Sequence, residues 1–100
     1  MPKSDAIKAI LTNNKESLTK EFGIRNLGIF GSVAEGRAGE KSDVDLFYEL
    51  SEGSFLDLYQ LEAFEKRIKK MLNHRKIDLV NLAYMNPIIR YRAEKSFIYV

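Results

Sequence analysis

Apolar side chains recur along the chain with two different periods, and the period separates predicted helices from predicted strands. Spacings of three and four residues indicate amphipathic helices over residues 4–22 and 55–72, whereas short continuous apolar runs indicate buried strands. We expect Asn13-Asn14 to divide the first helix into two pieces. The predicted helices cover 4–22, one or two turns after 31, 55–72 and 86–95; the predicted strands cover 25–30, 44–50 and 76–82, with an extended tail at 96–100.

Predicted helices and strands alternate along the chain, which begins with a helix and contains four helices and three strands before its extended tail. This order predicts an α/β (α+β) fold, in which helices pack on a small mixed β-sheet. Ser54 can cap the long helix, and Asn86 with Pro87 can start the last one. The apolar stripe of the long helix is expected to contain Leu58, Leu61, Phe64 or Glu65, Ile68 and Leu72.

Length and composition limit what the chain can be. One hundred residues predict a single domain over residues 1–100, with little room for a separate substrate-binding domain. A net charge of +2 is too small to argue for nucleic-acid binding, and the chain has no cysteine for disulfides or thiolate metal sites. Neither a membrane span nor a signal-peptide core is expected, so the predicted location is the cytoplasm.

One segment combines a glycine-containing turn with two closely spaced acids. An apolar run leads into Gly31-Ser32, and Asp43-Val44-Asp45 follows after ten intervening residues. Side chains alternate between the faces of a strand, so Asp43 and Asp45 point the same way, about 7 Å apart. Two carboxylates on one face repel each other and resist burial, and a divalent cation would relieve both effects. Oxygen ligands without nearby Cys or His favour Mg²⁺ over Zn²⁺.

This segment resembles the signature of nucleotidyltransferases related to DNA polymerase β, in which Gly-Ser, a short helix and Asp-x-Asp follow one another. The similarity extends from about Phe22 to Val100. The chain is most similar to the minimal nucleotidyltransferases, which have about this length and are often paired with HEPN-type toxins. The resemblance implies a mixed sheet flanked by helices, ATP as the donor and a toxin hydroxyl, on a tyrosine, as the acceptor.

A third carboxylate tests the idea of a metal site. Asp78 lies between Ile77 and Leu79 in the third predicted strand, where an unpaired buried carboxylate would be rare. The resemblance assigns Asp78 as the third acid, which would act as a general base or metal ligand in a two-metal site. Glu49 is a second candidate for this role, or a solvated residue at the sheet edge. The alternative for Asp78 is an ion pair with Arg25, Arg75 or Lys76.

The loop after the first strand has features suited to phosphate. Gly31 permits a tight turn and close approach of a ligand, and the Ser32 hydroxyl can donate to a phosphate oxygen at the start of a helix. Many relatives place a basic residue where this chain has Glu35. The acidic side chain at this position would weaken triphosphate binding. Arg37 and Lys41 lie in the same loop and are predicted to bind the phosphates instead.

These observations predict a Mg²⁺-dependent nucleotidyltransferase whose catalytic and metal-binding residues are Asp43, Asp45 and Asp78, with two Mg²⁺ ions and ATP as substrate. The resemblance makes it an antitoxin that adenylylates its partner toxin. Two alternatives stay open: a non-catalytic antitoxin that neutralises its partner by contact, or a transferase acting on a small molecule such as an antibiotic.

The C-terminal end is rich in large apolar side chains. Tyr91, Phe97 and Tyr99 are predicted to contribute to an interface, because aromatic residues are enriched in interface cores. The predicted occupant is the partner toxin or a second copy of the chain.

Overall fold

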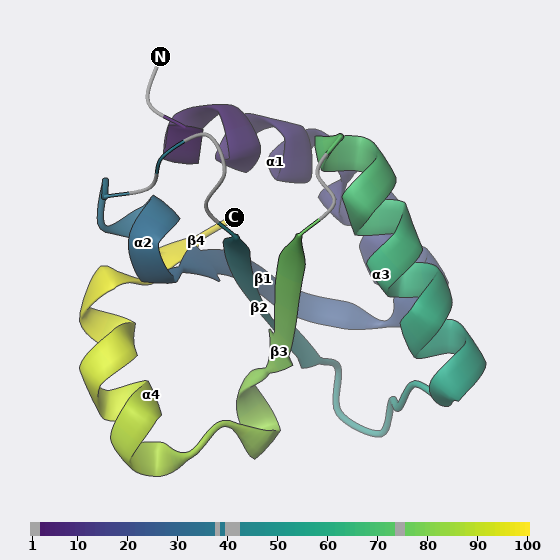
Figure 1. Cartoon of the computed structure of the whole chain (residues 1–100). Helices are drawn as coiled ribbons and strands as arrows, with labels where there is room; N and C mark the ends of the chain where they lie inside the picture. Colours follow the sequence, from purple (N-terminus) through teal and green to yellow (C-terminus); the bar gives the residue numbers. More distant parts are fainter. Residues whose placement is uncertain (1–2, 38, 40–42, 74–75) are drawn as a thin grey trace.

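A four-stranded mixed sheet forms the centre of the computed structural model, which describes residues 3–37, 39, 43–73 and 76–100 (Figure 1). The strand order is β3–β2–β1–β4. β1 (Ile24–Phe30) runs antiparallel to both β2 (Val44–Leu50) and β4 (Ile98–Tyr99), whereas β2 runs parallel to β3 (Ile77–Asn81). The mixed sheet predicted from the sequence is therefore confirmed, with a fourth strand in addition.

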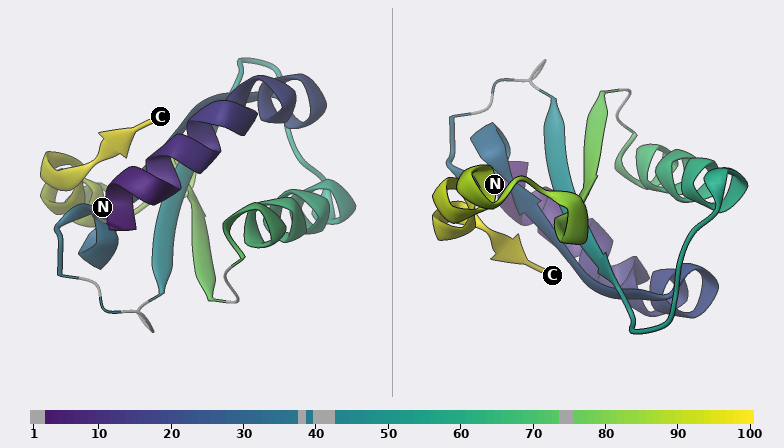
Figure 2. Two further views of the ribbon diagram at one scale, coloured as in Figure 1. Left: turned by 90° about the horizontal axis from the view of Figure 1, so that it is seen from above. Right: turned by 90° about the horizontal axis from the view of Figure 1, so that it is seen from below.

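Four α-helices surround this sheet. They are α1 (Lys3–Phe22), α2 (Gly31–Ala34), α3 (Leu58–Leu72) and α4 (Pro87–Ala93), accompanied by two single 3₁₀ turns, η1 (Leu82–Tyr84) and η2 (Glu94–Ser96). α1 crosses one face of the sheet (Figure 2), and α3 and α4 lie at opposite sides of the molecule (Figure 1). Within the described part of the chain, no helix has the length and apolar character needed to cross a membrane.

The main core lies between the sheet and helices α1 and α3. Leu27 of β1 and Leu46 of β2 are fully buried on this face, and Phe64 of α3 packs against Phe22 of α1 with ring centroids 5.3 Å apart. Burial of this apolar area supplies most of the driving force for a domain of this size. The buried core residues include Ile7, Leu11, Leu18, Phe22, Ile24, Leu27, Ile29, Val33, Val44, Leu46, Tyr48, Phe64 and Ile68.

The opposite face of the sheet carries a small aromatic cluster. Phe47 is fully buried there and stacks on Phe97 with centroids 4.3 Å apart, while Phe30 and Tyr99 pack around the same ring. Gly28 makes this possible, because a Cβ at this position would lie 2.2 Å from Cζ of Phe47. The cluster anchors the C-terminal segment to the sheet.

Several predicted boundaries are corrected by the structure. The first helix is continuous through Asn13-Asn14 rather than divided. The side-chain amide of Asn14 donates to the Ile10 carbonyl at 2.8 Å, so this side chain bonds to the preceding helical turn. Burial of Leu11 before Asn13-Asn14 and of Leu18 after it stabilises the helix on both sides of this pair.

The long helix begins three residues later than predicted. Asp57, not Ser54, is its N-cap: the Asp57 carboxylate accepts from the Gln60 amide at 2.8 Å, and the Gln60 side chain accepts from the Asp57 amide at 3.1 Å. This capping box satisfies two amides that helix geometry leaves without partners. Leu58 then lies outside the core, and the apolar stripe contains Phe64 rather than Glu65.

The C-terminal segment adds more structure than the sequence predicted. Asn86 caps α4 as expected, accepting from the Ile88 amide at 2.8 Å, but α4 ends at Ala93 and a 3₁₀ turn follows. The predicted extended tail becomes β4, and the Val100 amide donates to the Leu27 carbonyl at 2.9 Å.

At the end of β3, Asn81 starts the 3₁₀ turn at Leu82, so the strand is one residue shorter than predicted at each end.

Candidate functional site

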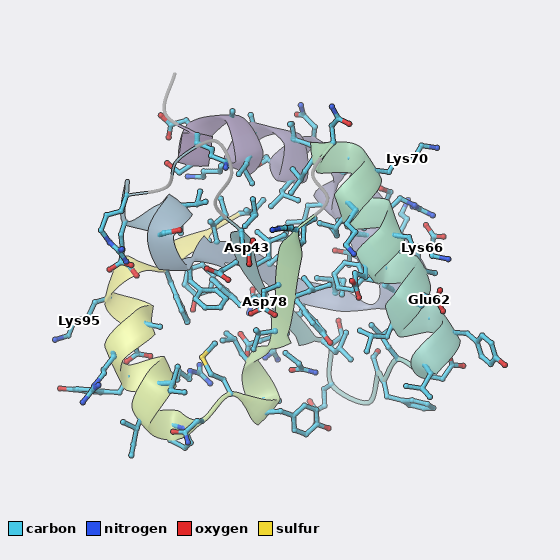
Figure 3. The ribbon with its side chains drawn as sticks, in the orientation of Figure 1. Asp43, Glu62, Lys66, Lys70, Asp78 and Lys95 are labelled. Atoms are coloured by element: carbon cyan, nitrogen blue, oxygen red, sulfur yellow. The ribbon has the colours of Figure 1, made fainter. Side chains whose placement is uncertain are left out.

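The three predicted acids lie near the N-terminal ends of the neighbouring strands β2 and β3. Asp43 directly precedes β2, and Asp45 is its second residue, so the two side chains share one face. Because β2 and β3 are parallel and in register, Asp45 lies opposite Asp78. Figure 3 shows Asp43 and Asp78 beside these central strands. The strand pairing thus brings together acids that are more than thirty positions apart in the sequence.

The electrostatic environment of Asp45 reflects this arrangement. Partial burial raises the pKa of the Asp45 carboxyl above its ordinary value, and the negative charges of Asp78 and Asp43 raise it further. Asp45 is half-buried, whereas Asp43 and Asp78 are exposed. Asp78 therefore differs from the buried carboxylate expected from its apolar neighbours in the sequence.

Gly31 fits against Asp45 in a way that the sequence did not reveal. Its φ of 72° lies in the left-handed region that favours glycine. A Cβ at this position would lie 2.2 Å from Oδ2 of Asp45, so any larger residue would displace the carboxylate. The antiparallel pairing of Phe30 with Asp45 causes this close approach, because it places the start of α2 beside the acid.

The loop after β1 is compact. α2 is one helical turn anchored by the buried Val33, and the Glu35 amide donates to the Gly31 carbonyl at 3.0 Å. The Arg37 amide then donates to the Ser32 carbonyl at 2.9 Å, which keeps Arg37 close to the Gly31-Ser32 turn. The other predicted phosphate ligand, Lys41, lies outside the described residues.

An ion pair inside this loop was not anticipated. Nη2 of Arg37 lies 2.7 Å from Oε2 of Glu35. The basic side chain predicted to compensate for Glu35 is therefore paired with Glu35 itself.

The remaining acid candidate has other partners. Glu49 contacts Arg25 at 3.5 Å and accepts from the Asn26 amide group at 3.1 Å. Arg25, which the sequence offered as a partner for Asp78, is thus paired with Glu49. A cleft of about 400 Å³ lies near this pair, at the far ends of β2 and β3, and the three aspartates do not line it.

The donor set suits a hard divalent cation, since three carboxylates supply oxygen ligands and, after burial, the charges of Asp78 and Asp43 help to raise the pKa of Asp45. Across the described positions, no three acidic or histidine side chains are close enough together to form a ready-made metal centre. Side-chain rotation would therefore be needed for Asp43, Asp45 and Asp78 to share a metal.

Comparison with known proteins places the chain in a family. The polymerase β nucleotidyltransferase model matches residues 7–100. Protein adenylyltransferase MntA of Thermococcus cleftensis is 34% identical over 97 residues, covering 96% of this chain and 94% of that protein. A solved structure described as a candidate minimal nucleotidyltransferase has a TM-score of 0.70 and 26% identity, covering 92% of this chain and 93% of the other.

A more distant structural neighbour has the same fold. It belongs to a solved complex of the tri-AMPylated HEPN toxin of Shewanella oneidensis with its MNT antitoxin, with a TM-score of 0.63 and 14% identity over 93% of this chain and 70% of that chain. At this identity the likeness concerns the fold alone. The family model and the curated relative span almost all of the sequence, and the chain therefore belongs to the polymerase β nucleotidyltransferase family.

Proposed function

We propose that this chain is a protein adenylyltransferase that acts as an antitoxin, transferring AMP from ATP to a tyrosine hydroxyl of a HEPN-type toxin. The observation that carries the proposal is the juxtaposition of Asp45 with Gly31 on one side and Asp78 on the other. The full-length similarity to an MntA adenylyltransferase supports the choice of AMP and of a protein acceptor. The fold shared with an antitoxin bound to an AMPylated HEPN toxin supports the choice of partner.

The Gly31-Ser32 turn would receive the triphosphate. The Ser32 hydroxyl can donate a hydrogen bond to a phosphate oxygen, and the absence of a side chain at Gly31 lets the Asp45 carboxylate lie against this turn. Arg37 is held near the same turn by its backbone bond to Ser32, so its guanidinium can reach a phosphate once Glu35 releases it.

The acids would divide the remaining work. Asp43 and Asp45 would hold two Mg²⁺ ions, which when bound supply positive charge to the phosphates and the acceptor oxygen. Asp78 would orient the acceptor hydroxyl and take its proton. The hydroxyl oxygen forms a bond to the α-phosphorus, and the bond from that phosphorus to the leaving pyrophosphate breaks.

One observation favours a second candidate, a binding module that neutralises the toxin by contact. The Glu35–Arg37 pair places a carboxylate on a guanidinium that would otherwise attract phosphate. In this alternative the chain binds the toxin but transfers nothing to it.

Mass spectrometry separates the two candidates. A HEPN-type protein from the same genome is incubated with the chain, ATP and Mg²⁺, and we expect one or more AMP groups on the toxin. Asp78→Ala is expected to slow transfer by about 10²–10⁴-fold while leaving the complex intact. Glu49→Gln is the control, because Glu49 is engaged with Arg25 and Asn26. An Asp78→Ala variant that still protects cells fully would establish contact as the mechanism.

A further inference from the structure

The ion pair between Glu35 and Arg37 occupies the loop that the proposed function assigns to the triphosphate. Three backbone hydrogen bonds fix this loop: Glu35 to Gly31 at 3.0 Å, Gly36 to Val33 at 3.2 Å and Arg37 to Ser32 at 2.9 Å. They hold the two charged side chains just beyond the Gly31-Ser32 turn. A carboxylate within 2.7 Å of the Arg37 guanidinium takes the position that a phosphate oxygen would take.

The geometry and exposure of the Glu35–Arg37 ion pair would allow another anion to replace Glu35. The pair is made by one terminal nitrogen of Arg37 and one oxygen of Glu35, whereas Arg67 meets Glu21 through both terminal nitrogens at 2.7 Å each. The Arg37 and Glu35 side chains are 66% and 42% exposed, so solvent screens their attraction. A triphosphate, with more charge and more acceptor oxygens, can therefore displace the carboxylate at a modest cost.

We propose that Glu35 is a positioning residue that sets the nucleotide affinity of this chain by competing with phosphate for Arg37, an inference that rests on the proposed function. The negative charge of Glu35 lowers affinity in two ways: it must release the guanidinium before phosphate binds, and it then stays near the bound phosphates. Arg37 itself binds the triphosphate. The consequence is an enzyme that binds its nucleotide more weakly than a chain with an uncharged residue at this position would.

Calorimetric titration of the full chain with Mg²⁺–ATP tests this. Glu35→Gln is expected to tighten binding by about 3–10-fold, the size expected for release of an exposed ion pair plus loss of one like charge. Arg37→Ala is expected to weaken binding, and adding Glu35→Gln to Arg37→Ala should then have little effect, because the guanidinium is gone. In steady-state assays Glu35→Gln should lower the KM for ATP with kcat unchanged. Glu16→Gln on α1 removes a more exposed charge that pairs with Lys20, far from this loop in the sequence, and should change nothing.

Two results would overturn the inference while leaving the proposed function in place. One is unchanged affinity in Glu35→Gln while Asp45→Asn loses Mg²⁺–ATP binding. The other is tightening of the same size with and without Arg37, which would mean that Glu35 acts by its charge alone. If Asp45→Asn binds Mg²⁺–ATP as well as the natural chain does, the proposed site is wrong and the role of Glu35 falls with it.

Discussion

At the scale of single residues, the contact between Gly31 and Asp45 has the strictest steric requirement. The backbone at Gly31 is left-handed, and the Asp45 carboxylate occupies the space of a missing side chain. Gly36, four residues after Ser32, has a similar φ of 76° but no atom within 4 Å of an added Cβ. The two glycines therefore separate the cost of backbone conformation from the cost of a clash.

We expect Gly31→Ala to be far more damaging than Gly36→Ala. Both variants force alanine into a left-handed conformation, which costs about 1–2 kcal/mol. Only Gly31→Ala must also displace Asp45, so its total loss in the free energy of unfolding should exceed about 3 kcal/mol. Urea denaturation measures both values, and equal losses would contradict the predicted role of the contact. Nucleotide transfer should survive in Gly36→Ala and be lost in Gly31→Ala.

Asp45 also makes stability depend on pH. Its folded-state pKa is raised above the ordinary value of 3.8, so the folded chain holds this proton more tightly than the unfolded chain does. The free energy of unfolding should therefore decrease as pH rises from 3.8 through the raised pKa, because the folded structure disfavours the ionised form of Asp45. The penalty is absent below pH 3.8 and fully present above the raised pKa.

Asp45→Asn removes this charge and should raise Tm at neutral pH by a few degrees. Its advantage over the natural chain should shrink as the pH falls towards 4. Thermal unfolding followed by circular dichroism between pH 4 and pH 8 measures the difference. Asp43→Asn is the matched comparison, and because Asp43 is exposed we expect a smaller gain. A lower Tm for Asp45→Asn at neutral pH would show that the carboxylate stabilises the fold.

At the scale of elements, the site depends on two strand pairings and one short turn. β1 delivers Gly31 at its end, β2 carries Asp45 and β3 carries Asp78. α3 supports β2 from the opposite face of the sheet, because Phe64 of α3 packs edge-on against Tyr48 of β2 with ring centroids 5.2 Å apart. Weakening α3 should therefore lower the stability of the sheet without touching the acids.

The N-cap of α3 offers such a test. Asp57→Ala removes the carboxylate that accepts from the Gln60 amide, and we expect a loss of about 1 kcal/mol, or about 4–8 °C in Tm. Ser54→Ala is the control, because Ser54 is not the cap of this helix. Nucleotide affinity below the melting range should be the same in both variants. An equal loss in Ser54→Ala would argue against the capping box.

At the scale of the whole molecule, the aromatic C-terminal segment divides between core and surface. Phe97 stacks on Phe47 in the aromatic cluster and is half-buried there, so it offers less surface to a partner than an exposed ring would. Tyr91 and Tyr99 are 67% and 52% exposed, and α4 also presents Ile88 and Ile89 to solvent. An interface at this end would therefore draw more on α4 and Tyr99 than on Phe97.

We expect the chain to associate with a HEPN-type partner or with a second copy through this end. Light scattering on the chain alone and on the co-expressed pair measures the assembly. Tyr91→Asp should weaken association without changing Tm, because the side chain is exposed, whereas Phe97→Asp should unfold the chain. A monomer that ignores the HEPN-type protein would favour a small-molecule acceptor.

Local sequence was sufficient for most of the elements and for part of the candidate site. The apolar periods predicted β1, β2 and β3 to within a residue, and alternation along a strand placed Asp43 and Asp45 on one face. The Asp-x-Asp motif after Gly-Ser also led to the family that the comparisons confirmed. These features depend on neighbours within a few residues, so they can be inferred before any contact between distant segments is known.

Only the tertiary structure decided how distant segments meet. The parallel register of β2 and β3 sets Asp78 opposite Asp45, and the antiparallel register of β1 and β2 brings Gly31 against the same carboxylate. β4 forms because its two residues pair with β1, although so short a segment shows no pattern typical of a strand in the sequence. The pairing of Glu35 with Arg37 likewise depends on how the loop folds back on α2. Each of these contacts depends on the register and path of the backbone in three dimensions, which side-chain periodicity does not encode.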